Sequence, residues 1–201
     1  MIFIGVEGQC CVFTQPRPKA ATLALAVKCE RFMETNNGRL QAAIEIATES
    51  AVTELFKSTK ERFYYCCLIT TGEANCPYLS AWSVEALSST AKTASEAAEI
   101  KWSYADSPYC FFGESYFEQV RKLFLLRSSI ESSETEYENR LGVMESALKA
   151  LDSKGLFGKD HHRNKLYINV EVVPPDYTNT ERAIRLNPPE AISEWLQEAA
   201  E

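Results

Sequence analysis

The chain has 201 residues, a hydrophobic fraction of 45%, a charged fraction of 24% and a formal net charge of −7. These values are typical of one globular domain that buries its own core. No apolar run approaches the ~20 residues that a membrane-spanning helix needs. Because the chain also lacks the basic balance on which nucleic-acid binding depends, we expect neither a membrane nor a nucleic acid as its partner.

The first 32 residues differ from the rest of the chain. Two short apolar runs flank a breaker, Gln15-Pro-Arg-Pro18, and lack the basic start and long apolar region of a secretory signal. Met33 then opens a polar stretch. We predict that residues 1–32 are an N-terminal extension, either disordered or outside the native domain, and that residues 33–201 form a single domain.

Helices and strands are predicted in turn along the first half of that domain. Apolar residues every three or four positions predict an amphipathic helix over residues 38–58. Residues 63–71 are apolar on both alternating faces, which predicts a central strand, and residues 78–84 predict its antiparallel neighbour. Another helix is expected at 85–98, and a further one after Gly113.

The second half begins with a Ser/Glu-rich stretch, residues 128–135, which we expect to be an exposed linker. A 4-3-4-3 spacing of apolar residues predicts the next helix, over 137–151. Residues 166–173 alternate as a strand does, and Asn187 precedes two prolines as the N-cap of a terminal helix would. The fold class predicted is α+β: a small, mainly antiparallel sheet with helices packed on it.

Seven cysteines occur, and two pairs of them are adjacent in sequence, Cys10–Cys11 and Cys66–Cys67. An odd number without a Cys-x-x-Cys motif argues against a disulfide framework or a structural zinc site. The simplest interpretation is that they are small buried side chains in a reducing compartment. We therefore expect a cytoplasmic protein without a bound metal or cofactor.

Aromatic residues are concentrated in the segment 102–117. Seven of them fall there: Trp102, Tyr104, Tyr109, Phe111, Phe112, Tyr116 and Phe117. Such a cluster anchors either a core or a binding surface. Core packing is the more common role, and we assign it to Phe117. The residues around the Ser107-Pro108 break are the binding candidates: Trp102, Tyr104, Asp106 and Tyr109.

Catalytic motifs are sparse. The only histidines, His161 and His162, lie in a polar stretch expected to be an exposed loop, where one of them could pair with a cysteine nucleophile. Asp160 and the two histidines are also a weak metal-binding pattern. The alternating Glu134, Glu136 and Glu138 are explained by a solvated helix start. We assign no catalytic residue.

An ordered set of motifs resembles a known family. They are Phe63-Tyr-Tyr, Ile100-Lys-Trp-Ser-Tyr-Ala-Asp, Gly113-Glu-Ser-Tyr-Phe, a late strand, and Arg185-Leu-Asn-Pro-Pro-Glu190. The order is similar to that of the bacterial family catalogued as domain of unknown function 4303, over about residues 37–200. The resemblance implies a cytosolic bacterial protein. Some relatives are thought to be immunity-like proteins encoded beside polymorphic toxins, and no catalytic residues are established for the family.

Three kinds of function remain open. The leading hypothesis is a non-enzymatic protein–protein interaction module, in the form of an immunity-type inhibitor of a toxin. Its acidic charge would suit the basic cleft of a nuclease. The alternative is a small enzyme that uses a cysteine nucleophile or the stretch from Asp160 to His162. A structural or regulatory domain is a third interpretation.

Overall fold

The computed structural model describes the backbone of residues 20–127 and 134–200, and the side chains of 36–127 and 135–200. The chain divides into two compact units, Met1–Thr35 and Asn36–Glu201. The second unit contains the sheet. The first helix, α1 (Ala20–Thr59), runs through Met33. The prediction that residues 1–32 are an extension remains a prediction, and most of the predicted linker at 128–135 lies outside the described residues.

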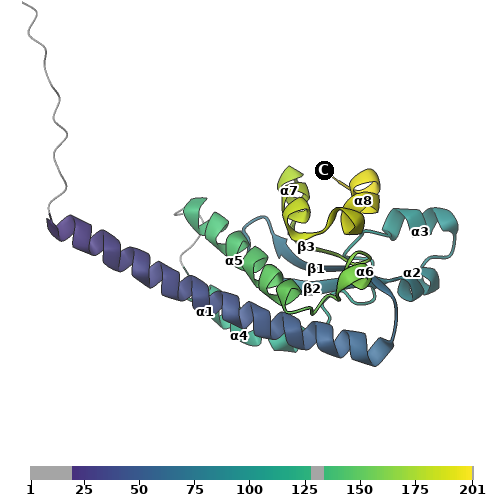
Figure 1. Ribbon diagram of the computed structural model, residues 1–201, viewed down its shortest axis with the longest axis horizontal. Coiled ribbons are helices and arrows are strands. Elements are labelled where there is room, and N and C mark those ends of the chain that lie inside the picture. The colour runs from purple at the N-terminus through teal and green to yellow at the C-terminus, as the bar shows by residue number, and fades with distance from the viewer. Residues whose placement is uncertain (1–19, 128–133, 201) are drawn as a thin grey trace, which may run out of the picture. The chain divides into compact units, whose positions relative to one another are not determined.

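A three-stranded sheet forms the centre of the unit Asn36–Glu201, in the order β2-β1-β3 (Figure 1). The strands are β1 (Phe63–Thr71), β2 (Tyr78–Ser83) and β3 (Tyr167–Val173). Strand β1 pairs antiparallel with β2 and parallel with β3. The α+β class is therefore confirmed, with a mixed rather than mainly antiparallel sheet. A parallel pair needs a crossover connection, and the long helical segment between β2 and β3 supplies it.

The helices that follow β2 begin where side chains cap them. Instead of one helix over 85–98 there are two, α2 (Val84–Thr90) and α3 (Ala94–Ile100). Ser83 Oγ accepts a hydrogen bond from the backbone N–H of Ala86, and Thr93 Oγ1 accepts one from Glu96. Each hydroxyl satisfies an otherwise unpaired amide, so each starts a helix of its own.

The helices predicted after Gly113, over 137–151 and at the C-terminus are present, and two further helices were not predicted. A 3-10 turn, η1 (Glu114–Phe117), leads into α4 (Glu118–Leu125), and α5 (Glu134–Ser153) follows. A short helix, α6 (Asp160–Arg163), stands where a loop was expected. Two helices close the chain, α7 (Tyr177–Leu186) and α8 (Pro189–Glu198).

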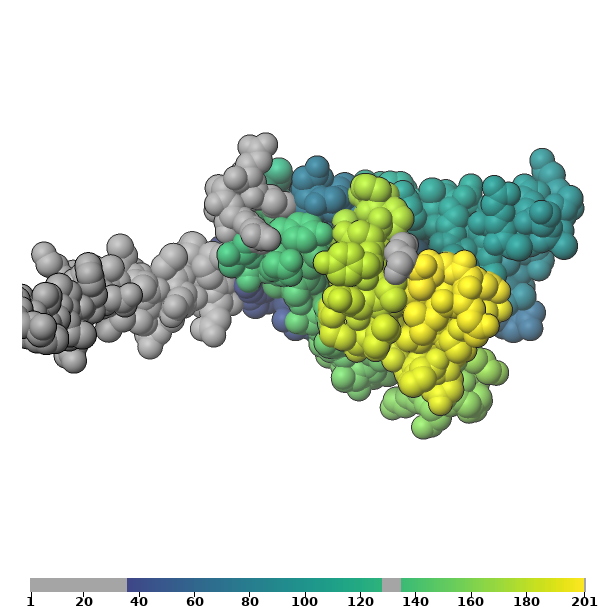
Figure 2. Space-filling view, turned by 90° about the horizontal axis from the view of Figure 1, so that it is seen from above, coloured from purple at the N-terminus to yellow at the C-terminus, as the bar shows by residue number. Residues whose placement is uncertain are grey.

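The two faces of the sheet bury different cores. One face carries Cys66, Leu68, Ile168 and Val170 and packs against the apolar sides of α1, α4 and α5. The other carries Tyr65, Cys67 and Tyr167 and packs against α8 through Ile192 and Trp195. Figure 1 shows α7 and α8 on the opposite side of the sheet from α1 and α4. In the space-filling view, α8 lies beside both α7 and the teal region that contains α3 (Figure 2).

Side chains, rather than a fourth strand, occupy the outer edge of β3. Asn179 of α7 exchanges two hydrogen bonds with the backbone of Val172, at 2.8 and 3.1 Å. Asn187 does the same at Ile168, at 2.9 and 2.6 Å, and Arg182 Nε donates to Val170 O. Asn187 is thus the C-cap of α7 and not the N-cap of α8, which starts at Pro189 without a side-chain cap.

Candidate binding site

Side chains of β2 hold the aromatic segment against the sheet by donating hydrogen bonds to backbone carbonyls of that segment. The indole N–H of Trp82 donates to Ser103 O at 2.7 Å, and Ser80 Oγ donates to Tyr104 O at 2.8 Å. Ser107 Oγ donates in turn to Ala81 O. These bonds satisfy groups that would be costly to bury alone. They also fix the positions of residues 102–104 relative to the sheet.

The structure brings together two of the four predicted binding residues. Trp102 and Tyr104 line one small cavity. Asp106 lies on an exposed turn, where its carboxylate accepts a hydrogen bond from Ser103 Oγ. Tyr109 donates its hydroxyl to Glu61 at 2.8 Å and does not line that cavity.

This cavity, which we call the aromatic pocket, has a volume of about 110 Å³. It lies where β3 ends, between the aromatic segment, α7 and α8. Its lining residues are Trp102, Tyr104, Glu171, Val172, Val173, Pro175, Asn179, Trp195 and Ala199. Trp195 stacks on Tyr167, with ring centroids 4.9 Å apart, and Trp102 meets Tyr167 edge-on at 6.1 Å. The aromatic walls are therefore packed against the sheet.

The carboxylate of Glu171 contributes the polar part of the pocket. Glu171 accepts hydrogen bonds from the hydroxyls of Tyr65 and Tyr167, at 2.6 and 3.1 Å, and from the Cys67 thiol at 3.5 Å. Burial, reinforced by neighbouring acidic groups, raises the pKa of Tyr65, Tyr167 and Cys67 well above their ordinary values. All three groups therefore keep their protons at neutral pH and act as donors to Glu171.

Glu171 and Trp195 were not among the predicted binding residues. Trp195 belongs to α8 and is buried. A signal for Glu171 was present in the alternation of β3. Its even positions are apolar, but Tyr167, Asn169 and Glu171 place polar groups on the other face, which faces Trp195 and not solvent. Polar residues on a strand covered on both faces are an indication of a site.

Aromatic walls beside a carboxylate form an environment suited to a cation. The faces of Trp and Tyr rings attract ammonium and guanidinium groups, and a carboxylate adds charge complementarity. The aromatic pocket is smaller than the ~300 Å³ at which small-molecule sites begin. Its size suits the end of one side chain.

The cysteines and histidines do not form a nucleophile–base pair in the described part of the chain. Burial raises the pKa of the Cys66 thiol to about 12 and that of Cys76 to about 11, and the reactive species is the thiolate. His161 and His162 are exposed on α6, and neither shares a hydrogen bond with a cysteine or carboxylate of the described residues. The same residues contain no metal-binding group of three or more His, Cys, Asp or Glu side chains.

The described features define an α+β domain with an aromatic and carboxylate pocket at the end of its last strand. Residues 44–188 match the family described as "Domain of unknown function (DUF4303)", and the chain belongs to this family. The resemblance seen in the sequence is thereby confirmed. Neither the curated proteins nor the solved structures gave a match to the chain. None of the helices in the described ranges has the length and apolar character that crossing a bilayer requires.

Proposed function

We propose that the chain is a non-enzymatic protein-binding module of the cytoplasm, and that the aromatic pocket receives a lysine or arginine side chain from its partner. One observation carries the proposal: Glu171 lines a cavity of about 110 Å³ together with the aromatic side chains Trp102, Tyr104 and Trp195. That volume suits one side chain and is too small for most metabolites. A protein partner supplies such a side chain together with a larger contact surface.

An immunity-type inhibitor of a bacterial toxin is the form of this function that we favour. A toxin that acts on nucleic acid needs a basic cleft, and the present chain carries a net charge of −7. Opposite charges accelerate the encounter of two proteins, and a basic side chain buried in the aromatic pocket would fix their orientation. The raised thiol pKa values do not favour the alternative of a cysteine-dependent enzyme.

A direct test needs no partner. Methylguanidinium is the end of an arginine side chain, and methylurea is its neutral counterpart of nearly the same shape. In two-dimensional NMR spectra we expect methylguanidinium to shift the indole N–H signals of Trp102 and Trp195, because both line the aromatic pocket, and to leave that of Trp82 in place. Methylurea should have little effect. Equal shifts with both probes, or none with either, would contradict the proposed cation site.

Affinity capture from the source cells tests the wider proposal. Glu171→Gln removes the charge but keeps the shape of the side chain, so recovery of the partner should fall about tenfold, as expected for the loss of a charge-assisted contact. Glu49→Gln, at an exposed position on α1, is the matched control and should capture as the wild type does. Recovery that is the same for Glu171→Gln and wild type would rule out the pocket as the recognition site.

A further inference from the structure

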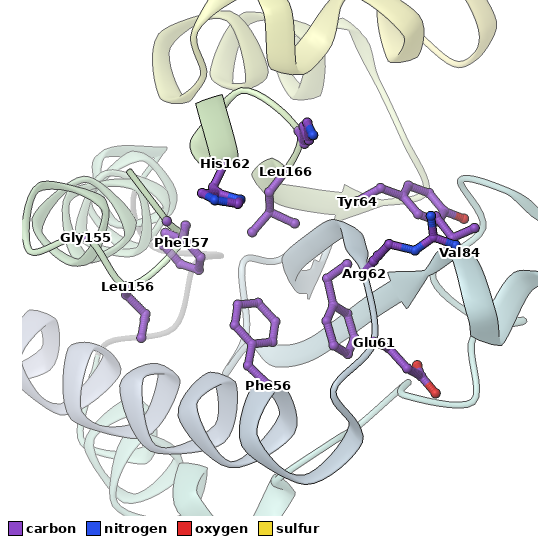
Figure 3. Close-up of a pocket in the computed structure, with 13 residues that line it drawn as sticks. Phe56, Glu61, Arg62, Tyr64, Val84, Gly155, Leu156, Phe157, His162 and Leu166 are labelled. Atoms are coloured by element: carbon purple, nitrogen blue, oxygen red, sulfur yellow. The ribbon is translucent and has the colours of Figure 1, made fainter. Parts of the chain in front are cut away.

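A second and larger cavity lies where the end of α1, the start of β1 and residues 155–166 meet (Figure 3). We call it the α1–α6 cavity. Its volume is about 680 Å³. This value lies inside the range of about 300–1,000 Å³ that small-molecule sites occupy. None of the four predicted binding residues lines it, so it is distinct from the aromatic pocket.

Apolar side chains from three segments form the interior of the α1–α6 cavity. Phe56 of α1 stacks on Phe63 of β1, with ring centroids 4.7 Å apart. Leu156, Phe157 and Leu166 face them from the other side (Figure 3). A ligand with an apolar body would remove this surface from water, which favours binding by about 25 cal/mol for each Å² covered.

Two glycines with positive φ shape the wall formed by residues 155–158. Gly155 has φ +85° and Gly158 has φ +101°, a region that other residues rarely adopt. A Cβ on Gly158 would lie 3.3 Å from the Cβ of His162. The turn is therefore tight enough to place His162 at the cavity (Figure 3).

The rim of this cavity is basic although the chain as a whole is acidic. Arg62 and Lys165 line it with basic side chains, and His162 contributes an imidazole. Arg62 is paired with Glu85 at 2.7 Å but its side chain stays 76% exposed. The Lys165 ammonium group makes no ion pair with a described residue.

One acidic residue, Glu61, also lines the cavity. Its carboxylate already accepts hydrogen bonds from the hydroxyls of Ser83 and Tyr109, at 2.5 and 2.8 Å. Those hydrogen bonds hold the carboxylate on the side toward β2 and the aromatic segment. Glu61 therefore forms its hydrogen bonds with Ser83 and Tyr109, and the Lys165 ammonium group is available to an anionic head group.

We propose that the α1–α6 cavity binds an amphipathic anion: a small molecule with an apolar body and a single anionic head group. The body occupies the space between Phe56, Phe157 and Leu166, and the head group lies against Lys165 and Arg62. Apolar lining with a few placed polar groups is the usual composition of such sites. This inference is independent of the proposed protein partner.

Two dyes that share a ring system provide the test. 1-Anilinonaphthalene-8-sulfonate carries an anionic head group, and N-phenyl-1-naphthylamine is the same molecule without it. In fluorescence titrations we expect Lys165→Gln and Arg62→Gln each to weaken binding of the sulfonate about fivefold and to leave the neutral dye unaffected. Lys122→Gln, an exposed position on α4, is the control and should change neither dye.

A second variant tests whether the dyes bind in the cavity at all. Val84 lies on the rim and is 39% exposed, so a tryptophan there fits without disturbing the core. Val84→Trp narrows the entrance and should weaken both dyes about tenfold, with an unchanged circular dichroism spectrum. Full binding of the sulfonate by Val84→Trp, equal losses of both dyes with Lys165→Gln, or no binding by wild type would each overturn the proposal. Competition by dodecanoate and by dodecyl phosphate then distinguishes a carboxylate from a phosphate head group.

Discussion

Glu136 shows how far a single residue can depart from its expected surroundings. Its place in an alternating run of glutamates suggested a solvated helix start, but its side chain is only 5% exposed. It accepts hydrogen bonds from Arg127, at 2.5 and 2.9 Å, and from Arg140 at 2.8 Å. Burial alone would raise the pKa of Glu136, but the two guanidinium groups outweigh it and hold the pKa below its ordinary value.

Glu136→Gln should destabilise the protein by about 3 kcal/mol at pH 7, because it removes the buried negative charge that the guanidinium groups of Arg127 and Arg140 contact. A carboxylate whose pKa is lowered on folding stabilises the protein fully above its unfolded pKa, about 4.3, and loses that contribution as the pH falls below it. The difference between wild type and variant should therefore shrink below about pH 4. Urea unfolding of wild type and variant, at pH 7 and again below about pH 4, measures this difference in stability.

The matched control is Glu138→Gln, which removes an exposed carboxylate from the same helix. Its effect should stay within about 0.5 kcal/mol at either pH. If Glu136→Gln is no more destabilising than this control, the buried cluster contributes nothing to stability.

Helix α7 completes the sheet by covering the outer edge of β3. Its Asn179 and Arg182, with Asn187 at its end, bond to the outer edge of β3, where an unpaired strand would otherwise be exposed. The composition of α7 also explains why the sequence did not predict it. Its buried residues include Asn179 and Arg182, so the helix offers few apolar residues from which a buried face could be recognised.

Asn187→Ala should destabilise the protein by about 2–4 kcal/mol, because the amide and carbonyl of Ile168 both lose a partner. Thermal or urea unfolding measures the loss. Asn164→Ala, at a partly exposed position whose side chain makes no hydrogen bond to a described residue, is the control and should change stability by less than about 0.5 kcal/mol. Similar losses in the two variants would show that the side-chain pairing of β3 adds no stability.

At the scale of the whole molecule, the sequence predicted elements, faces and the antiparallel pairing of 63–71 with 78–84, which is confirmed, but not the strand on the other side of β1. The strands at 63–71 and 166–173, and the buried sides of α1 and α5, follow from alternation and helical spacing. Alternation does not say which strands pair, so the parallel contact of β1 with β3 could not be predicted. The aromatic pocket depends on that contact, because Glu171 meets Tyr65 and Cys67 only across it. Trp102 and Tyr104, which line this pocket, were selected from the sequence because aromatic residues are concentrated in the segment that contains them.

The net charge of the chain leads to a prediction about how fast it associates with its partner. With a partner captured as above, the association rate constant should fall steeply between about 50 mM and about 500 mM salt, because ions screen the attraction between an acidic and a basic surface. The dissociation rate should change much less. Surface plasmon resonance or stopped-flow fluorescence separates the two rates. An association rate that is insensitive to salt would exclude steering by the net charge of −7.

The parallel pairing of β1 with β3 also determines when the strands can pair during synthesis. Strand β1 can pair with β2 as soon as the turn between them has been made, because the two are close in sequence. Its other edge must wait until translation has passed Val173. Contacts between segments so far apart form slowly, and an unpaired edge invites pairing with other chains. From the completion of β2 until Val173 has been made, the nascent protein therefore exposes one edge of the central strand of its future sheet.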